Sequence, residues 1–245
     1  MQAEVGRCLL PQTAQCAILY VCHRPEKVRK WRAIIEEALR TNVLRSGDAS
    51  KLAGGLSWAT QNLFSRFGRA LLRPLYAQQY GRSSQCSKPL RMALKWWLEV
   101  LALQLAETRL WKRPSTQPLQ LFADARGQPP RLAAVLVGNG RILYTDMEPA
   151  AGVLAFFKKR ADNQIMSLEL LALALGLSTF AAQCASQRVR VFSDNVGAER
   201  SADKGSAKEW DHSAIVHCLW HRAAQLHCHL FIERVPTKAR WSAFA

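Results

Sequence analysis

The chain has 245 residues, of which 49% are hydrophobic and 21% charged. This composition is sufficient for a buried core and excludes a disordered chain. Lys and Arg number 34 against 18 Asp and Glu, a formal net charge of +16, which favours a polyanionic partner, nucleic acid ahead of an anionic membrane surface. Residues 1–114 hold 19 basic and 7 acidic side chains, whereas residues 115–245 hold 15 and 11.

The seven cysteines show no CxxC spacing, and the sequence has neither a signal-peptide pattern nor an apolar run of 18 residues. We therefore expect an intracellular protein of the cytoplasm or nucleus, with reduced cysteines and no membrane span. A zinc site is an alternative reading, because metal-binding residue types cluster near the end of the chain: His217, Cys218, His221, His227, Cys228 and His229. His217 and His221 have the spacing of facing helix residues, but no second Cys pair completes a tetrahedral set.

The first part of the chain reads as mainly helical. An apolar strand is predicted at residues 16–22 and a helix at residues 26–40, where apolar side chains recur at helical spacing. A second helix is predicted from Ser46, with an apolar row that continues to Leu71, and a third at residues 89–111. The arginines near one face of the second helix suit phosphate contacts, although each also fits a solvated basic face: Arg66, Arg69 and Arg73.

The pattern changes after a proline-containing linker at residues 112–118, so we place a domain boundary between residues 1–114 and 115–245. Short apolar runs predict five strands, and two helical patterns separate the last three, in the order βββαβαβ. The strands are expected at residues 119–123, 131–137, 141–145, 189–193 and 229–235, and the helices at residues 167–182 and 211–226. Gly138-Asn139-Gly140 predicts a tight hairpin, because Asn and Gly tolerate positive φ.

Three carboxylates end or begin these elements. Asp124 ends the first strand of the second domain, Glu169 opens its long helix, and Asp194 ends the fourth strand. Each one alone could be a turn or capping residue. If the fold brings them together, however, their mutual repulsion favours cations between them, and oxygen ligands select Mg²⁺ or Mn²⁺. Two such ions support in-line displacement at phosphorus.

This order of elements and acids resembles a type 1 ribonuclease H domain, over roughly residues 117–240. The matching features are the strand with Asp124, the helix with Glu169, the strand with Asp194, and a closing strand that runs into RVPTK at residues 234–238. More narrowly, the chain is similar to the ribonuclease H end of DIRS-like retroelement reverse transcriptases. The stretches that carry this narrower resemblance are RADNQI at 160–165, SDN at 193–195, KGSAK at 204–208 and WDH at 210–212, and residues 48–76 look like a thumb-to-connection helix.

The resemblance implies an α/β fold, a ribonuclease H-like mixed five-stranded sheet in the order 3-2-1-4-5 with flanking helices, preceded by the smaller helical region. It also implies metal-dependent hydrolysis of the RNA strand of RNA–DNA hybrids, leaving a 3′-hydroxyl, with Asp124, Glu169 and Asp194 as metal ligands. The hybrid is expected to be held through its backbone and 2′-hydroxyls. The basic residues expected to contact it are Arg66, Arg69, Arg73, Lys204, Lys208 and Lys238.

The sequence departs from the family where a fourth metal ligand is expected. Arg240 stands in place of the family's Asn and Ala243 in place of its final Asp. We expect the last helix to be missing, as in a fragment or decayed copy, and we find no upstream polymerase Asp-Asp motif. Asp203, Glu209 and Asp211 are nearby replacements, although Asp211 better suits capping of the following helix. No clear match exists for a catalytic His, since His227 and His229 read as strand residues. The alternative function is therefore a catalytically weakened or inactive nucleic-acid-binding module.

Overall fold

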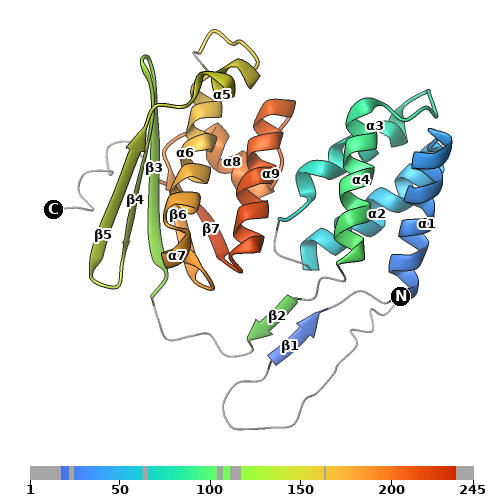
Figure 1. Cartoon of the computed structure of the whole chain (residues 1–245), viewed down its shortest axis with the longest axis horizontal. Coiled ribbons are helices and arrows are strands. Elements are labelled where there is room, and N and C mark those ends of the chain that lie inside the picture. Colours follow the sequence, from blue (N-terminus) through green and yellow to red (C-terminus); the bar gives the residue numbers. More distant parts are fainter. Residues whose placement is uncertain are drawn as a thin grey trace. The chain divides into compact units, whose positions relative to one another are not determined.

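The computed structural model describes residues 18–21, 25–62, 66–103, 107–110, 117–162 and 164–235 (Figure 1). The chain divides into two compact units, Met1–Ser115 and Thr116–Ala245. Lys238, Arg240, Ala243 and the expected loss of the last helix fall outside the described residues, as does most of the predicted linker. Within the part of the chain that is described, no helix is long and apolar enough to cross a bilayer.

The first unit combines a helical cluster with a two-stranded sheet. Strand β1 (Ile18–Val21) pairs antiparallel with β2 (Glu107–Leu110). The helices are α1 (Pro25–Thr41), α2 (Ser46–Asn62), the 3₁₀-helix η1 (Arg69–Leu72), α3 (Arg73–Tyr80) and α4 (Lys88–Ala102). Their apolar faces form one buried cluster that includes Ile35, Leu52, Leu56, Leu75, Leu90, Leu94 and Trp97.

Two of the predicted helices in this unit are shorter than their apolar rows suggest. The second ends at Asn62, and the chain then turns through Gly68, whose φ of +78° no continuous helix allows. The third ends at Ala102 instead of continuing to Trp111, because residues 107–110 form a strand on β1. This segment is a strand because it pairs with β1, which lies about 90 residues earlier in the chain. The helical periodicity of the sequence does not reveal such a pairing.

The α1–α2 contact depends on a glycine. A Cβ atom on Gly55 would lie 2.6 Å from Nε1 of Trp31 on α1, a distance that real Cβ atoms do not show. Glycine at this position therefore lets the Trp31 side chain approach the backbone of α2 closely.

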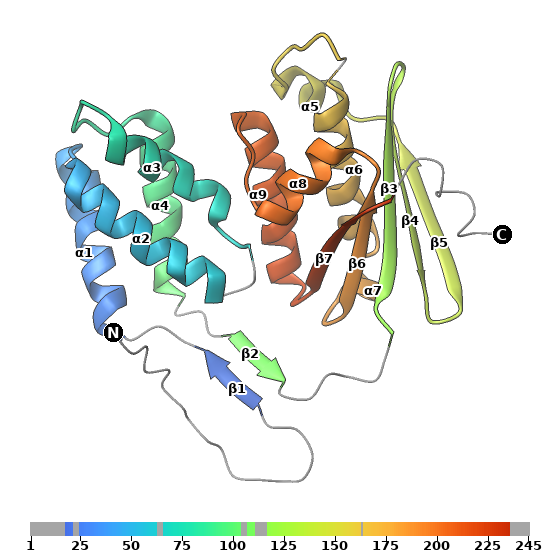
Figure 2. The same cartoon turned by 180° about the vertical axis from the view of Figure 1, so that it is seen from behind.

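The second unit is an α/β structure built on a mixed five-stranded sheet. Its strands lie in the order β5-β4-β3-β6-β7, which is the predicted order 3-2-1-4-5 (Figures 1 and 2). Strand β3 pairs antiparallel with β4 and parallel with β6, and β6 pairs parallel with β7. The strands are β3 (Leu119–Gly127), β4 (Pro130–Gly138), β5 (Arg141–Met147), β6 (Arg188–Ser193) and β7 (His229–Arg234).

In the described part of this unit, five helices accompany the sheet: α5 (Ala151–Phe156), α6 (Ile165–Thr179), α7 (Ala181–Cys184), α8 (Val196–Lys204) and α9 (Trp210–Gln225). The sequence predicted α6 and α9, and missed α5 and α8. Helix α5 has only six residues and no buried side chain, and α8 is short and polar, so neither has a strong apolar row. The predicted hairpin is confirmed, since Asn139 and Gly140 have φ values of 52° and 70° between the paired residues Gly138 and Arg141.

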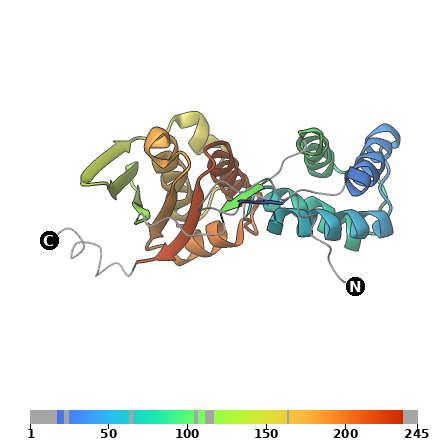
Figure 3. The same ribbon diagram turned by 90° about the horizontal axis from the view of Figure 1, so that it is seen from below.

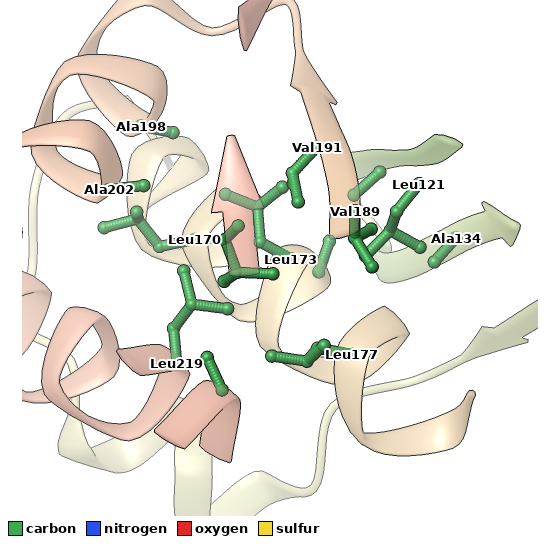
Figure 4. Close-up of a cluster of buried hydrophobic side chains, with 14 of the residues drawn as sticks. Leu121, Ala134, Leu170, Leu173, Leu177, Val189, Val191, Ala198, Ala202 and Leu219 are labelled. Atoms are coloured by element: carbon green, nitrogen blue, oxygen red, sulfur yellow. The ribbon is translucent and has the colours of Figure 1, made fainter. Parts of the chain in front are cut away.

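Helix α6 is the centre of this unit's core. It packs against β3 and β4 on one side and against α9 on another, and Figure 3 shows α6 and α9 on the same side of the sheet. At Gly176 a Cβ atom would lie 2.8 Å from Ala134 Cβ and 2.9 Å from Leu121 Cδ1, so glycine allows the helix to seat closely on the strands. Figure 4 shows side chains of the sheet, α6, α8 and α9 meeting in one cluster, among them Leu121, Leu173, Val191, Ala202 and Leu219.

Candidate metal centre

Asp124 lies at the point where β3 continues beyond its parallel neighbour. The β3–β6 pairing ends at Phe122–Phe192, whereas the β3–β4 pairing runs on to Gly127. The expectation that Asp124 ends its strand is therefore wrong, because the hairpin with β4 extends β3 by three residues. Asp194 directly follows the last residue of β6, so both acids lie at the same end of the β3–β6 pair.

Glu169 reaches this edge from the first half of α6. It is only 3% exposed, because α6 is embedded between the sheet and α9. Its Oε1 atom accepts a hydrogen bond from the backbone N–H of Ala125, with a length of 3.2 Å. The helix thereby holds a buried carboxylate beside the residue that follows Asp124.

One carboxylate oxygen from each of Asp124, Glu169 and Asp194 lies within 4.8 Å of the other two. Glu169 is buried, Asp194 is half-buried, and Asp124 is exposed, so the group opens to solvent on one side. Three carboxylates this close repel one another unless a cation lies among them. Hard, all-oxygen donor sets suit divalent cations such as Mg²⁺ and Mn²⁺, so these residues fit a divalent metal site.

The turn that carries Asp194 is fixed by its two neighbours. Ser193 Oγ accepts a hydrogen bond from the backbone N–H of Asn195 at 3.3 Å. The Asn195 side chain in turn caps α8, since its Oδ1 accepts from the backbone N–H of Ala198 at 3.0 Å. The Ser-Asp-Asn stretch is recognisable in the sequence, but the cap is not, because α8 has no strong apolar row that would predict a helix.

Asp211, one of the three nearby acids considered as a replacement fourth ligand, is engaged elsewhere. Its two carboxylate oxygens each accept a 2.8 Å hydrogen bond from the guanidinium of Arg160, and they also accept from the backbone N–H groups of Lys158 and His212. Burial by itself would raise the pKa of Asp211, but these hydrogen bonds outweigh burial and hold that pKa well below its usual range. The carboxylate is 0% exposed.

Asp211 is also not the cap of α9 that the sequence suggested. It is the second residue of the helix, and Glu209 occupies the capping position without a side-chain cap bond. Glu209 instead pairs with Lys158 Nζ at 2.8 Å, and Asp203 is exposed on α8. Arg160 lies in the loop before α6 and Asp211 at the start of α9, 51 residues apart in the chain, so nothing in the local sequence pattern signals their pairing.

The basic residues expected to contact nucleic acid belong to both units. Arg66, Arg69 and Arg73 lie on the turn, the 3₁₀-helix and the start of α3 in the first unit. Arg73 is exposed, and the other two are half-buried. Lys204 ends α8 and Lys208 precedes α9 in the second unit, and both are exposed.

The described residues give no support to a zinc site among the histidines and cysteines near the end of the chain. Among them, the acidic triad is the only group of three or more His, Cys, Asp or Glu side chains with ligand atoms in mutual reach. The rings of His217 and His221 lie 5.9 Å apart, Cys218 is exposed, and Cys228 is buried. His227 is not a strand residue as expected, because it sits at φ 49° in the turn before β7, which begins at His229.

Comparison of the sequence with models of known protein families gives no match, and a search of curated protein sequences gives none either. The fold and the site together define an α/β unit with a carboxylate cluster able to hold a metal ion.

Proposed function

We propose that the second unit is a ribonuclease H-like domain that hydrolyses the RNA strand of RNA–DNA hybrids, as part of a retroelement-derived reverse transcriptase. The observation that carries this proposal is the convergence of Asp124, Glu169 and Asp194 within 4.8 Å at one end of a mixed sheet in the order 3-2-1-4-5. The motif stretches around these acids support the retroelement assignment.

Asp124, Glu169 and Asp194 would hold divalent cations, Mg²⁺ or Mn²⁺. When bound there, such ions would lower the pKa of the attacking water and neutralise the charge that develops on the leaving oxygen. The reaction is a hydrolysis: an O–P bond forms to water, the bond from phosphorus to the 3′ oxygen breaks, and that oxygen takes up a proton. The products are a 3′-hydroxyl and a 5′-phosphate.

The residues of the chain itself provide position and access. Ala125 N–H orients the Glu169 carboxylate, and the Ser193–Asn195 turn fixes the backbone that carries Asp194. Exposed Asp124 leaves the site open on the side where a scissile phosphate must approach. Lys204 and Lys208 are exposed basic residues of the same unit, and the excess of basic residues across the chain favours a polyanionic substrate.

The proposal is tested with an end-labelled RNA–DNA hybrid in the presence of Mg²⁺ or Mn²⁺. The wild-type chain should cleave the RNA strand, and Asp124→Asn should reduce the rate at least 100-fold. Asp146→Asn is the matched control, because Asp146 is an exposed acid on β5 that pairs with Arg131 and lies outside the triad. Equal rates for wild type and Asp124→Asn would overturn the proposal.

A second candidate is a module that binds hybrids without cleaving them. Two observations favour it. Asp211 is hydrogen-bonded to Arg160 and is not part of the metal cluster, and among the described residues the cluster contains three carboxylates. Hybrid affinity that survives Asp194→Asn, with no turnover by either form, identifies this second function.

A further inference from the structure

Helix α4 presents a row of cations on its exposed side. Lys88, Arg91 and Lys95 are all exposed and recur at i, i+3 and i+7, so they lie along one face of the helix. At 1.5 Å per residue the row extends for about 10 Å. The opposite side of the helix packs into the core through Leu90, Leu94 and Trp97, so the cationic side faces away from the core.

The three cations line a pocket together with Cys86 and Met92. Its volume is about 280 Å³. A water molecule in the liquid occupies about 30 Å³, so a phosphate group and several waters fit. Met92, 64% exposed, is the one large apolar side chain of the lining.

No acidic side chain forms an ion pair with this face within the described residues. None of Lys88, Arg91 and Lys95 takes part in an ion pair there, although Arg32 and Arg40 on α1 pair with Glu36 and Glu37. Glu99, one turn beyond Lys95, is the only acid of α4 and is exposed without such a pair.

The charge of this face distinguishes it from another pocket of the same unit. A cavity of about 620 Å³ is lined by residues of α1, the start of α2 and the segment between them, and it includes Glu37 and Asp48. Those carboxylates repel phosphate, whereas the α4 pocket offers three cations and no acid.

We propose that the Lys88–Arg91–Lys95 face binds the phosphate backbone of a nucleic acid, as a surface separate from the metal centre. A row of uncompensated cations complements a chain of phosphates and contacts it without reading sequence. The excess of 19 basic over 7 acidic residues in residues 1–114 favours the same polyanion. A membrane surface is a poorer partner, because an interfacial helix needs an apolar face and this one offers Met92 alone. The inference does not rest on the proposed cleavage.

The test uses the full chain and a fluorescent DNA duplex of about 20 base pairs, which contains no RNA strand to cleave. Binding is measured across a salt titration for wild type and for the triple variant Lys88→Gln, Arg91→Gln, Lys95→Gln. Each lost phosphate contact lowers the salt slope by about 0.9, so the slope should fall by roughly 2 to 3. The affinity at about 0.1 M salt should fall more than tenfold.

The matched control changes the same net charge elsewhere in the unit, with Arg29→Gln, Lys30→Gln and Arg45→Gln, all of them exposed residues. Thermal unfolding checks that both triple variants fold.

The proposal stands if only the α4 variant shows the reduced salt dependence of duplex binding, while the salt slope of the control variant stays within one unit of wild type. Equal losses in both variants, or no loss in either, overturn it. Loss of binding to phosphatidylserine vesicles by the α4 variant, with duplex binding unchanged, also overturns it and assigns the face to membranes. The duplex contains no RNA strand, so this outcome does not depend on cleavage and is separate from failure of the cleavage proposal.

Discussion

The backbone N–H of Ala125 donates a hydrogen bond of 3.2 Å to Oε1 of Glu169. The bond joins the strand that carries Asp124 to the buried helix that carries Glu169, so it holds the Glu169 carboxylate beside the residue that follows Asp124. A carboxylate that is 3% exposed and close to two others is costly without a cation.

Glu169→Gln should separate metal binding from folding. The amide keeps an oxygen that can accept from Ala125, and it removes a buried charge, so the metal-free free energy of unfolding should stay the same or rise by about 1 kcal/mol. Mg²⁺ at ten times its dissociation constant should stabilise wild type by about 1.4 kcal/mol and the variant far less. Thermal unfolding with and without Mg²⁺ measures both effects, and an equal Mg²⁺ shift in the two proteins contradicts the site.

The Arg160–Asp211 pair should matter far more for stability than the Arg131–Asp146 pair. Arg160 is 17% exposed and Asp211 is 0% exposed, whereas both members of the other pair are more than 40% exposed. Arg160→Met leaves a buried charge without its partner and should cost about 3–5 kcal/mol. Arg131→Met should cost less than about 1 kcal/mol. Urea unfolding of the two variants gives the comparison, and similar losses would show that the buried pair does not anchor α9.

His217 should make the protein less stable in mild acid. Burial, with a smaller contribution from the charge of His221, lowers the pKa of His217 to about 4. An unfolded histidine titrates near 6.5, so between about pH 6.5 and 4 the unfolded chain binds a proton that the folded chain does not. The free energy of unfolding therefore falls as the pH drops through this window.

His217→Gln should flatten the pH profile of stability between about pH 6.5 and 4. His229→Gln is the matched control, because His229 is an exposed histidine at the start of β7. Denaturant unfolding at several pH values measures the slopes. An unaltered slope in His217→Gln would contradict the burial of a neutral imidazole at this position.

Gly176→Ala should destabilise the second unit by about 1–3 kcal/mol, because the added methyl meets Ala134 and Leu121 at distances below 3.0 Å. Gly152→Ala on α5 is the matched control. Its added methyl meets nothing within 4 Å, so it should be neutral or stabilising by about 0.5–1 kcal/mol. Thermal unfolding ranks the two, and a stabilising Gly176→Ala would show that α6 does not seat tightly on β3 and β4.

The sequence predicted those parts of the fold that depend on local chemistry or on strong periodicity. Asn139-Gly140 adopts the positive φ values that its residue types favour, and α6 is apolar enough to be recognised as a buried helix. Asp124, Glu169 and Asp194 were selected because they lie next to these recognisable elements.

The features that the sequence did not reveal depend on partners distant in the chain. Residues 107–110 form a strand because β1 pairs with them. Asp211 accepts hydrogen bonds from Arg160, which is 51 residues away in the chain. Short polar helices such as α8 lack an apolar row, so their stability comes from the core that Ala198 and Ala202 join.

The end chemistry of the RNA products tests the central claim most directly. We predict that wild type with Mg²⁺ cuts the RNA strand of a hybrid into fragments with 3′-hydroxyl and 5′-phosphate ends, extendable by a DNA polymerase, and that Asp124→Asn yields none. Fragments with 2′,3′-cyclic phosphate ends, or the same fragments from Asp124→Asn or in the presence of a chelator, would contradict hydrolysis at the three-carboxylate site.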